Sequence, residues 1–362
     1  MVRFWLGGYG AEMQGTASGI GLLAGDEGAE TALSYRGAAT DTRSPSWLAA
    51  HPRLDIVYAA LEADAAVQAF ARTGESALTP LGEPVGAGKY VCHLSVAPDG
   101  RYLLASCYGD GRVVRIGLDN AGRLVPDAAH KAAALRAALF GENDSPEAPA
   151  AGVAAAAVDP YADTARESHA HSAAFLPDGR IATTDLGFDL VRIWRASPAA
   201  LVLDHEVVFP KGTGPRHMVV HPSGHLHVVT EYSCEVFTLA SAPDGTWSVV
   251  SSVLASPAAD ADVAAELART RDGQFLYTAL RGSNTIAALR VRGAGESLEP
   301  IALADSGVDW PRHHLVHEGK LLVAGQRSDS IALLDLDERT GAPLGIRHRA
   351  PVPTPTHFLP VR

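Results

Sequence analysis

The sequence contains few cysteines and no long apolar run. Cys92, Cys107 and Cys234 are the 3 cysteines among 362 residues, and their spacing fits neither paired disulfides nor a metal site, so we expect reduced thiols. No apolar stretch approaches the roughly 18 residues needed to cross a bilayer. The N-terminal residues lack the apolar core and cleavage site of an export signal. These absences favour a cytoplasmic protein that has no membrane partner.

Basic residues are also in deficit. The chain has 30 Lys and Arg against 41 Asp and Glu, which gives a formal net charge of −11. A surface of this sign does not neutralise phosphates, so we expect no nucleic-acid partner.

What the chain has instead is a repeated unit. Its clearest copy is a strand at 216–221, a Pro-Ser-Gly turn ending at Gly224, and an apolar, β-branched strand at 226–231. Similar units begin near His93, His171 and Leu267, and weaker ones near Trp47 and His314. The turn glycines 100, 179, 224, 273 and 319 lie 79, 45, 49 and 46 residues apart.

Two further strands follow each unit, and four antiparallel strands in about 45 residues indicate a blade of a β-propeller. A seventh inner strand at 357–361 has no second strand after it, whereas residues 3–9 read as a second strand with no first. Joining the two ends removes both exposed edges. We therefore predict an all-β, seven-bladed propeller, a single domain over residues 1–362, closed by one C-terminal and three N-terminal strands. The third and fourth strands of the closing blade are expected at 19–23 and 32–35.

The spacing of 79 residues marks an Ala-rich insertion at 127–167, between blades two and three. It contains one possible short helix at 129–139. A solvated surface connection and a lid over the channel are both compatible with this composition.

Each blade brings two positions to one end of the central channel, because the start of an inner strand lies beside the end of its antiparallel neighbour. Asp-Gly turns occupy the opposite end. Several His, Arg and Glu side chains in one channel are costly to assemble unless a ligand uses them. These positions hold His93 with Tyr108, His169 and His171 with Asp185, Arg216 and His217 with Glu231, Glu266 with Arg281, Arg312, His313 and His314 with Gln326 and Arg327, Trp47 with Glu62, and His357 with Tyr9 or Gly10.

These residues are also compatible with two other interpretations. Arg216, Glu231 and Arg281 could form a buried salt-bridge network between blades. His169 and His171 could bind a metal together with Asp185 or Glu231, but no third ligand has a characteristic spacing and the nearby arginines would oppose a cation. We expect no metal and no cofactor.

At these motifs the chain resembles the seven-bladed propeller lactonases, the family that includes propeller-type bacterial 6-phosphogluconolactonases and fungal carboxy-cis,cis-muconate cyclases. The resemblance covers nearly the whole chain. It implies a catalytic set of His171, Arg216, Glu231 and Arg281. The residues that carry it are 92–101, 168–172, 176–180, 214–217, 280–286, 310–312 and 325–330.

The chain departs from the family pattern at three places. Thr230 and Leu280 stand where the family usually has Asn, and Glu266 lies in the inner strand of blade five, where many members have His. These departures indicate a pocket adapted to a substrate other than the common one. The second strands of blades three and four also look one residue short.

We therefore expect a lactonase of carbohydrate metabolism, a hydrolase that acts on a small sugar-derived or anionic lactone. Glu231 or His171 would take a proton from water, while Arg216 and Arg281 would stabilise the oxyanion or hold a substrate carboxylate or phosphate. Water is the nucleophile because no Ser or Cys lies in a recognisable elbow. The residues expected to contact substrate are His93, His169, Asp185, His217, Glu62, Tyr108, Arg312 and Gln326.

Two alternative functions remain open. The paired arginines also suit a cycloisomerase that closes a muconate-type dicarboxylate to a lactone. A non-enzymatic propeller that binds a partner is the third possibility, because residues 188–194 resemble a WD-type strand, although no blade has the matching Gly-His pair. Monomer and homodimer are both compatible with the sequence.

Overall fold

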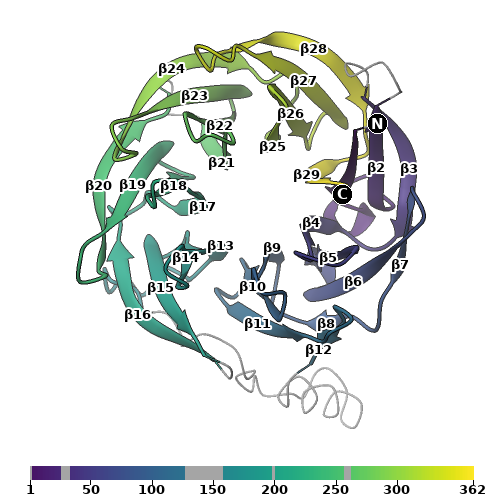
Figure 1. The fold of residues 1–362 in the computed structure, drawn as a ribbon, viewed down its shortest axis with the longest axis horizontal. Helices are drawn as coiled ribbons and strands as arrows, with labels where there is room; N and C mark the ends of the chain where they lie inside the picture. The colour runs from purple at the N-terminus through teal and green to yellow at the C-terminus, as the bar shows by residue number, and fades with distance from the viewer. Residues whose placement is uncertain (1, 26–32, 127–157, 198–199, 257–261) are drawn as a thin grey trace.

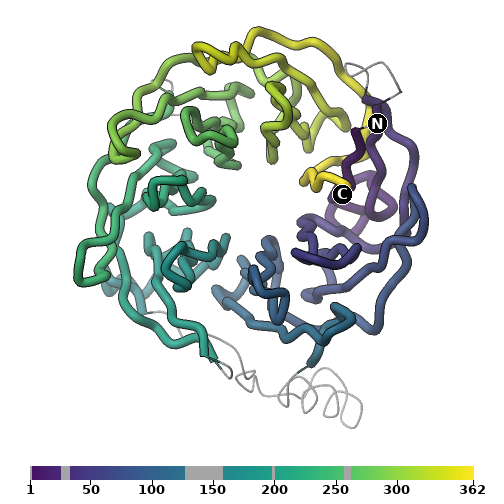
Figure 2. The backbone as a smooth tube through the Cα atoms, viewed as in Figure 1, coloured from purple at the N-terminus to yellow at the C-terminus, as the bar shows by residue number. Residues whose placement is uncertain are grey.

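The computed structural model describes residues 2–25, 33–126, 158–197, 200–256 and 262–362. In this part of the chain, seven antiparallel sheets are arranged radially around a central axis (Figure 1). The backbone trace shows the same ring, with the first strand of each sheet near the axis (Figure 2). The predicted all-β, seven-bladed propeller is confirmed.

Blades one to three follow the chain from residue 45. Blade one contains β4 (Pro45–Ala50), β5 (Ile56–Leu61), β6 (Ala66–Thr73), β7 (Ala77–Pro80) and the short β8 (Val85–Gly86), which pairs with β6. Blade two contains β9 (Val91–Val96), β10 (Tyr102–Cys107), β11 (Val113–Leu118) and β12 (Leu124–Val125). Blade three contains β13 (Ala170–Phe175), β14 (Ile181–Asp185), β15 (Leu190–Ala196) and β16 (Leu201–Val208).

Blades four to six are regular. Blade four contains β17 (Pro215–Val220), β18 (Leu226–Thr230), β19 (Glu235–Ser241) and β20 (Trp247–Leu254). Blade five contains β21 (Val263–Arg269), β22 (Phe275–Arg281), β23 (Thr285–Arg292) and β24 (Ser297–Asp305). Blade six contains β25 (Pro311–His317), β26 (Lys320–Gly325), β27 (Ser330–Leu336) and β28 (Pro343–Pro351). Two 3₁₀ turns, η1 (Ala11–Met13) and η2 (Glu62–Asp64), lie outside these strands.

The two ends of the chain share blade seven, as expected. Its strand order is β29 (Pro355–Pro360), β1 (Arg3–Gly8), β2 (Gly19–Gly25) and β3 (Leu33–Asp41), so one C-terminal and three N-terminal strands close the ring. Leu6 pairs with Phe358, and both side chains are buried. Closure satisfies the backbone groups that two open edges would expose.

Some expected boundaries differ from the structure. The fourth strand of the closing blade, β3, extends to Asp41, well beyond the expected end at residue 35. Most of the 127–167 insertion, including the helix expected at 129–139, lies outside the described residues. The turn glycines explain why Gly recurs at these positions: Gly100 and Gly224 have φ of 69° and 93°, a region in which a side chain is strained.

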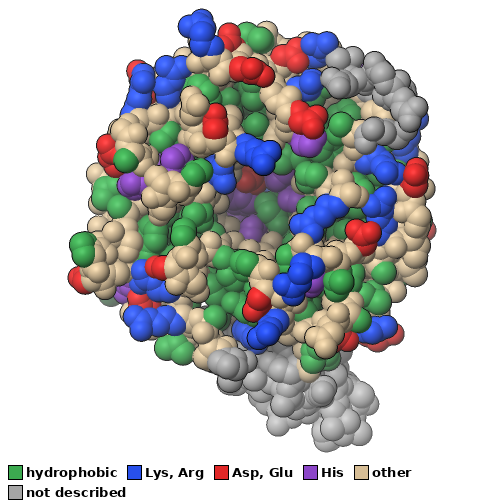
Figure 3. Space-filling model, viewed as in Figure 1, with side chains coloured by type: hydrophobic (Ala, Val, Ile, Leu, Met, Phe, Trp, Pro, Cys, Tyr) green, Lys and Arg blue, Asp and Glu red, His purple; other side chains and the backbone are tan. Residues whose placement is uncertain are grey.

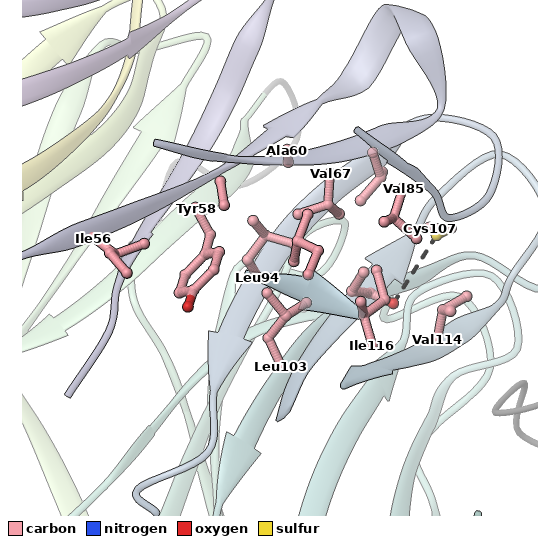
Figure 4. Packing of buried hydrophobic residues seen from close by; sticks show 14 residues of the cluster. Ile56, Tyr58, Ala60, Val67, Val85, Leu94, Leu103, Cys107, Val114 and Ile116 are labelled. Atoms are coloured by element: carbon pink, nitrogen blue, oxygen red, sulfur yellow. Dashed lines mark hydrogen bonds between the residues drawn. The ribbon is translucent and has the colours of Figure 1, made fainter. Parts of the chain in front are cut away.

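Apolar layers between neighbouring sheets hold the blades together. Between blades one and two, Tyr58 packs with Leu94, Leu103 and Ile116 (Figure 4). The Tyr58 hydroxyl donates a hydrogen bond of 2.8 Å to the Gly122 carbonyl, so its polar atom is satisfied inside the layer. Each fully buried large aliphatic side chain contributes about 1.5–3 kcal/mol. These layers fix the inner strands around the tunnel.

Candidate active site

A repeated bulge shapes one end of the tunnel. Every inner strand has a register shift against its second strand, near its first residues. In blade four, Pro215 pairs with Thr230 and His217 with Val229, so Arg216 is the extra residue. The extra residue interrupts the alternation of side chains, and two consecutive residues can turn toward the tunnel. These bulge pairs are Ser46–Trp47, Cys92–His93, His171–Ser172, Arg216–His217, Ala265–Glu266, Arg312–His313 and Thr356–His357.

The tunnel end that these pairs line is hollow and charged. Seen along the axis, histidine side chains lie at the base of a central hollow, with Arg or Lys and Asp or Glu side chains around them (Figure 3). The second strands end at this level. The side chains there are Tyr9, Glu62, Tyr108, Leu186, Glu231, Arg281 and Gln326.

Arg216, Glu231 and Arg281 meet in this hollow. Glu231 Oε2 accepts from Arg216 Nε at 2.7 Å and lies 3.0 Å from Arg281 Nη2. The Arg216 side chain is 3% exposed and its Nη1 has no hydrogen-bond partner among the described residues. Arg281 also donates to the Val263 and Ala264 carbonyls. A buried guanidinium with an unused donor is costly, which points to a ligand as its partner.

The two guanidiniums control the charge of Glu231. Burial alone would raise the pKa of its carboxyl, but Arg281 and Arg216 outweigh burial and lower it. Burial and the neighbouring Arg216 lower the pKa of Arg281 to about 10, so it remains a cation at neutral pH. The cluster is therefore one carboxylate held between two cations.

His171 lies on the neighbouring blade, within the same hollow. Its ring centroid is 5.0 Å from that of His217 and 6.2 Å from that of Tyr108. Its Nδ1 is buried and has no hydrogen-bond partner within the residues that the structure describes. Burial, with the charges of Arg216 and its neighbours, puts the pKa of His171 well below the usual value, so the imidazole is neutral.

Trp47 and four histidines form the floor of the hollow. The indole lies with its centroid 4.5 Å from His93, 5.2 Å from His217, 5.4 Å from His313 and 4.0 Å from His357. His217 Nδ1 lies 2.8 Å from Glu266 Oε2. Burial, as the largest cause, lowers the pKa of all four histidines, so the floor carries no imidazolium charge at neutral pH.

A second cluster of polar side chains lies on the wall of the hollow that blades six, seven and one form. Glu62 accepts a hydrogen bond of 3.0 Å from the Tyr9 hydroxyl. Arg312 stands over the Tyr9 ring, 5.1 Å from its centroid, and Nη1 donates to Gln326 at 3.4 Å. Arg312 therefore adds a third guanidinium to the hollow.

Tyr108 and His169 lie at the outer rim of blades two and three. Their rings stack at 4.4 Å and 8°, and His169 Nδ1 lies 2.7 Å from the Tyr108 carbonyl. His169 also lines a rim cleft together with Leu186 and the half-exposed Tyr232. His169 therefore lies at the rim, whereas His171 lies inside the hollow.

Asp185 is placed differently from the expectation. The register puts Leu186, not Asp185, level with Glu231 and Arg281. Asp185 is fully buried and accepts from Arg192 at 2.7 Å and from the His169 and Phe188 backbone amides. Asp185 occupies the register position of Thr230 in blade four, one residue before the tunnel position, so its carboxylate bonds to β15 and its own loop, and we leave it out of the proposed site.

Sequence reasoning gave no role to several residues of this site. Glu266, Trp47, His313, His357 and Tyr9 were recognised only as channel positions, and Tyr232 was missed. A signal for the bulges was present, because two consecutive polar residues, as in Arg216–His217 and Arg312–His313, break the alternation of a strand.

Among the described residues, no three His, Cys, Asp or Glu side chains are placed to hold a metal ion. Within the same residues, no helix is long and apolar enough to cross a membrane. The cytoplasmic location, and monomer or homodimer as the assembly, stay predictions.

Fold and site together define a seven-bladed β-propeller with a polar pocket at one end of its tunnel. The chain belongs to the family described as Lactonase, 7-bladed beta-propeller, whose model matches residues 3–360. It is 27% identical over 352 residues to the 6-phosphogluconolactonase of Bacillus subtilis, covering 93% of each chain.

Solved structures show the same fold. A Lactobacillus plantarum protein superposes with a TM-score of 0.82 at 24% identity, over 99% of this chain and 100% of that one. The periplasmic gluconolactonase of Pseudomonas aeruginosa superposes with a TM-score of 0.81 at 22% identity, over 100% of this chain and 99% of that one.

Proposed function

We propose that this protein hydrolyses a small, negatively charged, sugar-derived lactone. The observation that carries the proposal is Arg216 Nη1, a buried donor that has no partner in the described part of the chain, beside the carboxylate of Glu231. An oxygen that gains negative charge during ester hydrolysis is a suitable partner for such a donor. Membership of the lactonase family and the similarity to a 6-phosphogluconolactonase support an ester of this cyclic kind.

The charges of the pocket favour an anionic substrate. Arg216, Arg281 and Arg312 contribute three guanidiniums, and the two acidic residues beside them, Glu231 and Glu62, balance only part of that charge. Arginine binds carboxylates and phosphates through paired hydrogen bonds. Lys211, the lysine nearest to Arg216 in sequence, is engaged with Asp163 at 2.9 Å, so anion recognition rests on the arginines.

Water is the nucleophile in the mechanism that we propose. Cys92 belongs to the bulge pair beside His93, and its Sγ lies 3.6 Å from the His171 carbonyl. Burial, with a smaller contribution from Glu62, raises the pKa of the Cys92 thiol to about 12, so it is not a thiolate at neutral pH. Attack of water on the ring carbonyl produces an oxyanion that Arg216, supported by Arg281, stabilises.

The remaining polar residues would orient the substrate. His93 and His217 lie at the floor, Glu62, Arg312 and Gln326 on one side, and Tyr108 and His169 at the rim. His171 and Glu231 are the two groups proposed from the sequence as the base that activates water.

The test is lactone hydrolysis followed by pH-stat, on 6-phosphogluconolactone, unphosphorylated aldonolactones and muconolactones, with and without EDTA. We expect turnover that survives EDTA and is strongest on one of the anionic lactones. Lactone formation from a muconate without lactone hydrolysis would instead assign a cycloisomerase. No reaction with any of these compounds would refute the proposed function and favour a binding role.

A further inference from the structure

Two carboxylates flank the bulge pair Arg216–His217 and differ in their partners. Arg216 contacts Glu231, whereas His217 Nδ1 lies 2.8 Å from Glu266 Oε2. Glu266 belongs to β21 of blade five and is 8% exposed. The same oxygen is 3.7 Å from His313 Nε2 on blade six. Glu266 therefore joins three blades at the floor of the hollow.

Glu266 lacks the partners that would hold it ionised. No arginine forms an ion pair with it among the described residues, and its Oε2 has no well-aligned hydrogen-bond donor there. Burial raises the pKa of Glu266 to about 7, although His314 and Arg216 oppose the rise. Glu231 shifts in the opposite direction. Two acids whose environments push their pKa values apart are the usual sign of divided acid and base roles.

Both bases proposed from the sequence have a physical weakness. Glu231 shares one oxygen between two guanidiniums, which favours its ionised form and makes it a weak proton acceptor. His171 would become a buried imidazolium beside the cation Arg216, because no carboxylate among the described residues pairs with its Nδ1. Burial and Arg216 lower the pKa of His217 in the same way, but Glu266 can accept its second proton, so His217 need not become an imidazolium. An efficient general base has its pKa near the working pH.

Building on the lactonase function proposed above, we propose that His217 and Glu266 act together as the general base. His217 takes a proton from the attacking water at Nε2 and releases the proton of Nδ1 to Glu266 as the new C–O bond forms. When the ring C–O bond breaks, Glu266 returns its proton to Nδ1 and Nε2 protonates the departing ring oxygen. His217 contacts the reacting atoms, and Glu266 positions it and stores the proton.

The geometry supports this division. Nδ1 and Oε2 are 2.8 Å apart, which is hydrogen-bond distance, and proton transfer requires the carboxyl to rotate into line with the ring N–H. The His217 ring also borders His171 and His93, with centroids 5.0 and 5.7 Å away, so it belongs to the floor of the hollow. The oxyanion donor Arg216 is the preceding residue, so one bulge supplies both the donor and the base.

The surrounding charges determine whether His217 or Glu266 holds the proton that they share. At the tunnel end of the neighbouring strands the charged and titratable groups are Arg216 and His217 of β17, Glu231 after β18, Arg281 of β22, and Arg312, His313 and His314 of β25; His227, Tyr277 and His317 lie further along β18, β22 and β25. The four histidines named for the floor, and His314, have pKa values below the usual one, mainly because of burial. Glu266 is the group of this set that titrates near neutrality.

The deciding experiment is the pH dependence of kcat/KM for wild type, Glu266→Gln and Glu266→Asp. We expect wild-type kcat/KM to fall as the pH drops through about 7. Glu266→Gln should lower kcat/KM by about 10²–10⁴ and abolish that acid limb. Glu266→Asp should restore part of the activity with a displaced limb. Glu206→Gln, which alters a carboxylate bonded to Arg192 at 3.0 Å in blade three, is the control and should match wild type.

Wild-type kcat/KM and an unchanged acid limb in Glu266→Gln would overturn the proposal. An infrared titration of the carboxyl band separates this failure from failure of the lactonase function, because it needs no substrate. Wild type should show one buried carboxyl that titrates near pH 7, absent in Glu266→Gln and displaced in His217→Asn. A band that is the same in all three proteins would overturn the coupling of Glu266 to His217, whatever the substrate.

Discussion

Glu231→Gln tests the central charge cluster most directly. Glutamine keeps the size of the side chain and one carbonyl oxygen but removes the charge between Arg216 and Arg281, whose side chains are 3% and 6% exposed. Removing one partner of a buried ion pair typically costs about 3–5 kcal/mol, because the remaining charge stays buried and uncompensated. We expect the free energy of unfolding of Glu231→Gln to fall by about that amount, and lactone turnover to fall with it.

The same variant should gain affinity for anions. With Glu231 neutral, Arg216 and Arg281 both lack a counter-ion, so an aldonate product should bind more tightly than it binds wild type. A ligand at 100 times its Kd stabilises the folded state by about 2.7 kcal/mol, enough to recover most of the loss. The measurements are urea unfolding with and without aldonate, and aldonate binding by calorimetry.

The control for this experiment is Glu299→Gln, which breaks an ion pair between half-exposed Glu299 and Arg292. Its free energy of unfolding should change by less than about 1 kcal/mol and its aldonate affinity should not change. If Glu231→Gln is as stable as wild type and binds aldonate no better, Glu231 does not hold the guanidiniums and the argument for the cluster fails.

Three further predictions follow from the same pocket. Arg216→Ala should lower kcat/KM by about 10²–10³ while circular dichroism still reports a folded propeller; wild-type turnover would exclude Arg216 as the oxyanion donor. Iodoacetamide should modify native Cys92 far more slowly than a model thiol at pH 8, because burial raises the pKa of the thiol to about 12; rapid labelling in mass spectrometry would contradict its burial. The free energy of unfolding should fall as the pH drops below about 6.5, because five histidines that stay neutral in the folded state become protonated in the unfolded chain: His93, His171, His217, His313 and His357. Each contributes up to about 1.4 kcal/mol per pH unit, and Glu266, whose pKa is raised, opposes the fall as a single group. Urea unfolding that is independent of pH between about 5 and 7 would refute the neutral histidine floor.

Much of the candidate site could be predicted because a propeller constrains its residues strongly. Once the repeat assigns an inner strand to each blade, the start of that strand must lie at the tunnel, whatever the loops do. That reasoning named Arg216, Glu231 and Arg281, and the structure brings both guanidiniums to within 3.0 Å of the Glu231 carboxylate. Asp185 is the exception, since the register places it level with Thr230 of blade four, one residue before the tunnel position, where its carboxylate bonds to Arg192.

The sequence by itself determined the number of blades, the closure of the ring and the face that gathers charge, because these depend on a period that every blade repeats. Only the tertiary structure decided which charges neutralise one another. The bulge in an inner strand lets two consecutive residues face the tunnel, and contacts between neighbouring blades join side chains that are far apart in sequence. Those contacts decide the partners of each buried carboxyl. Glu231 lies beside two guanidiniums, whereas Glu266 lies beside imidazoles. The partners in turn set the protonation state of each carboxyl, because charge in a buried site depends on the nearest partners rather than on the residue type.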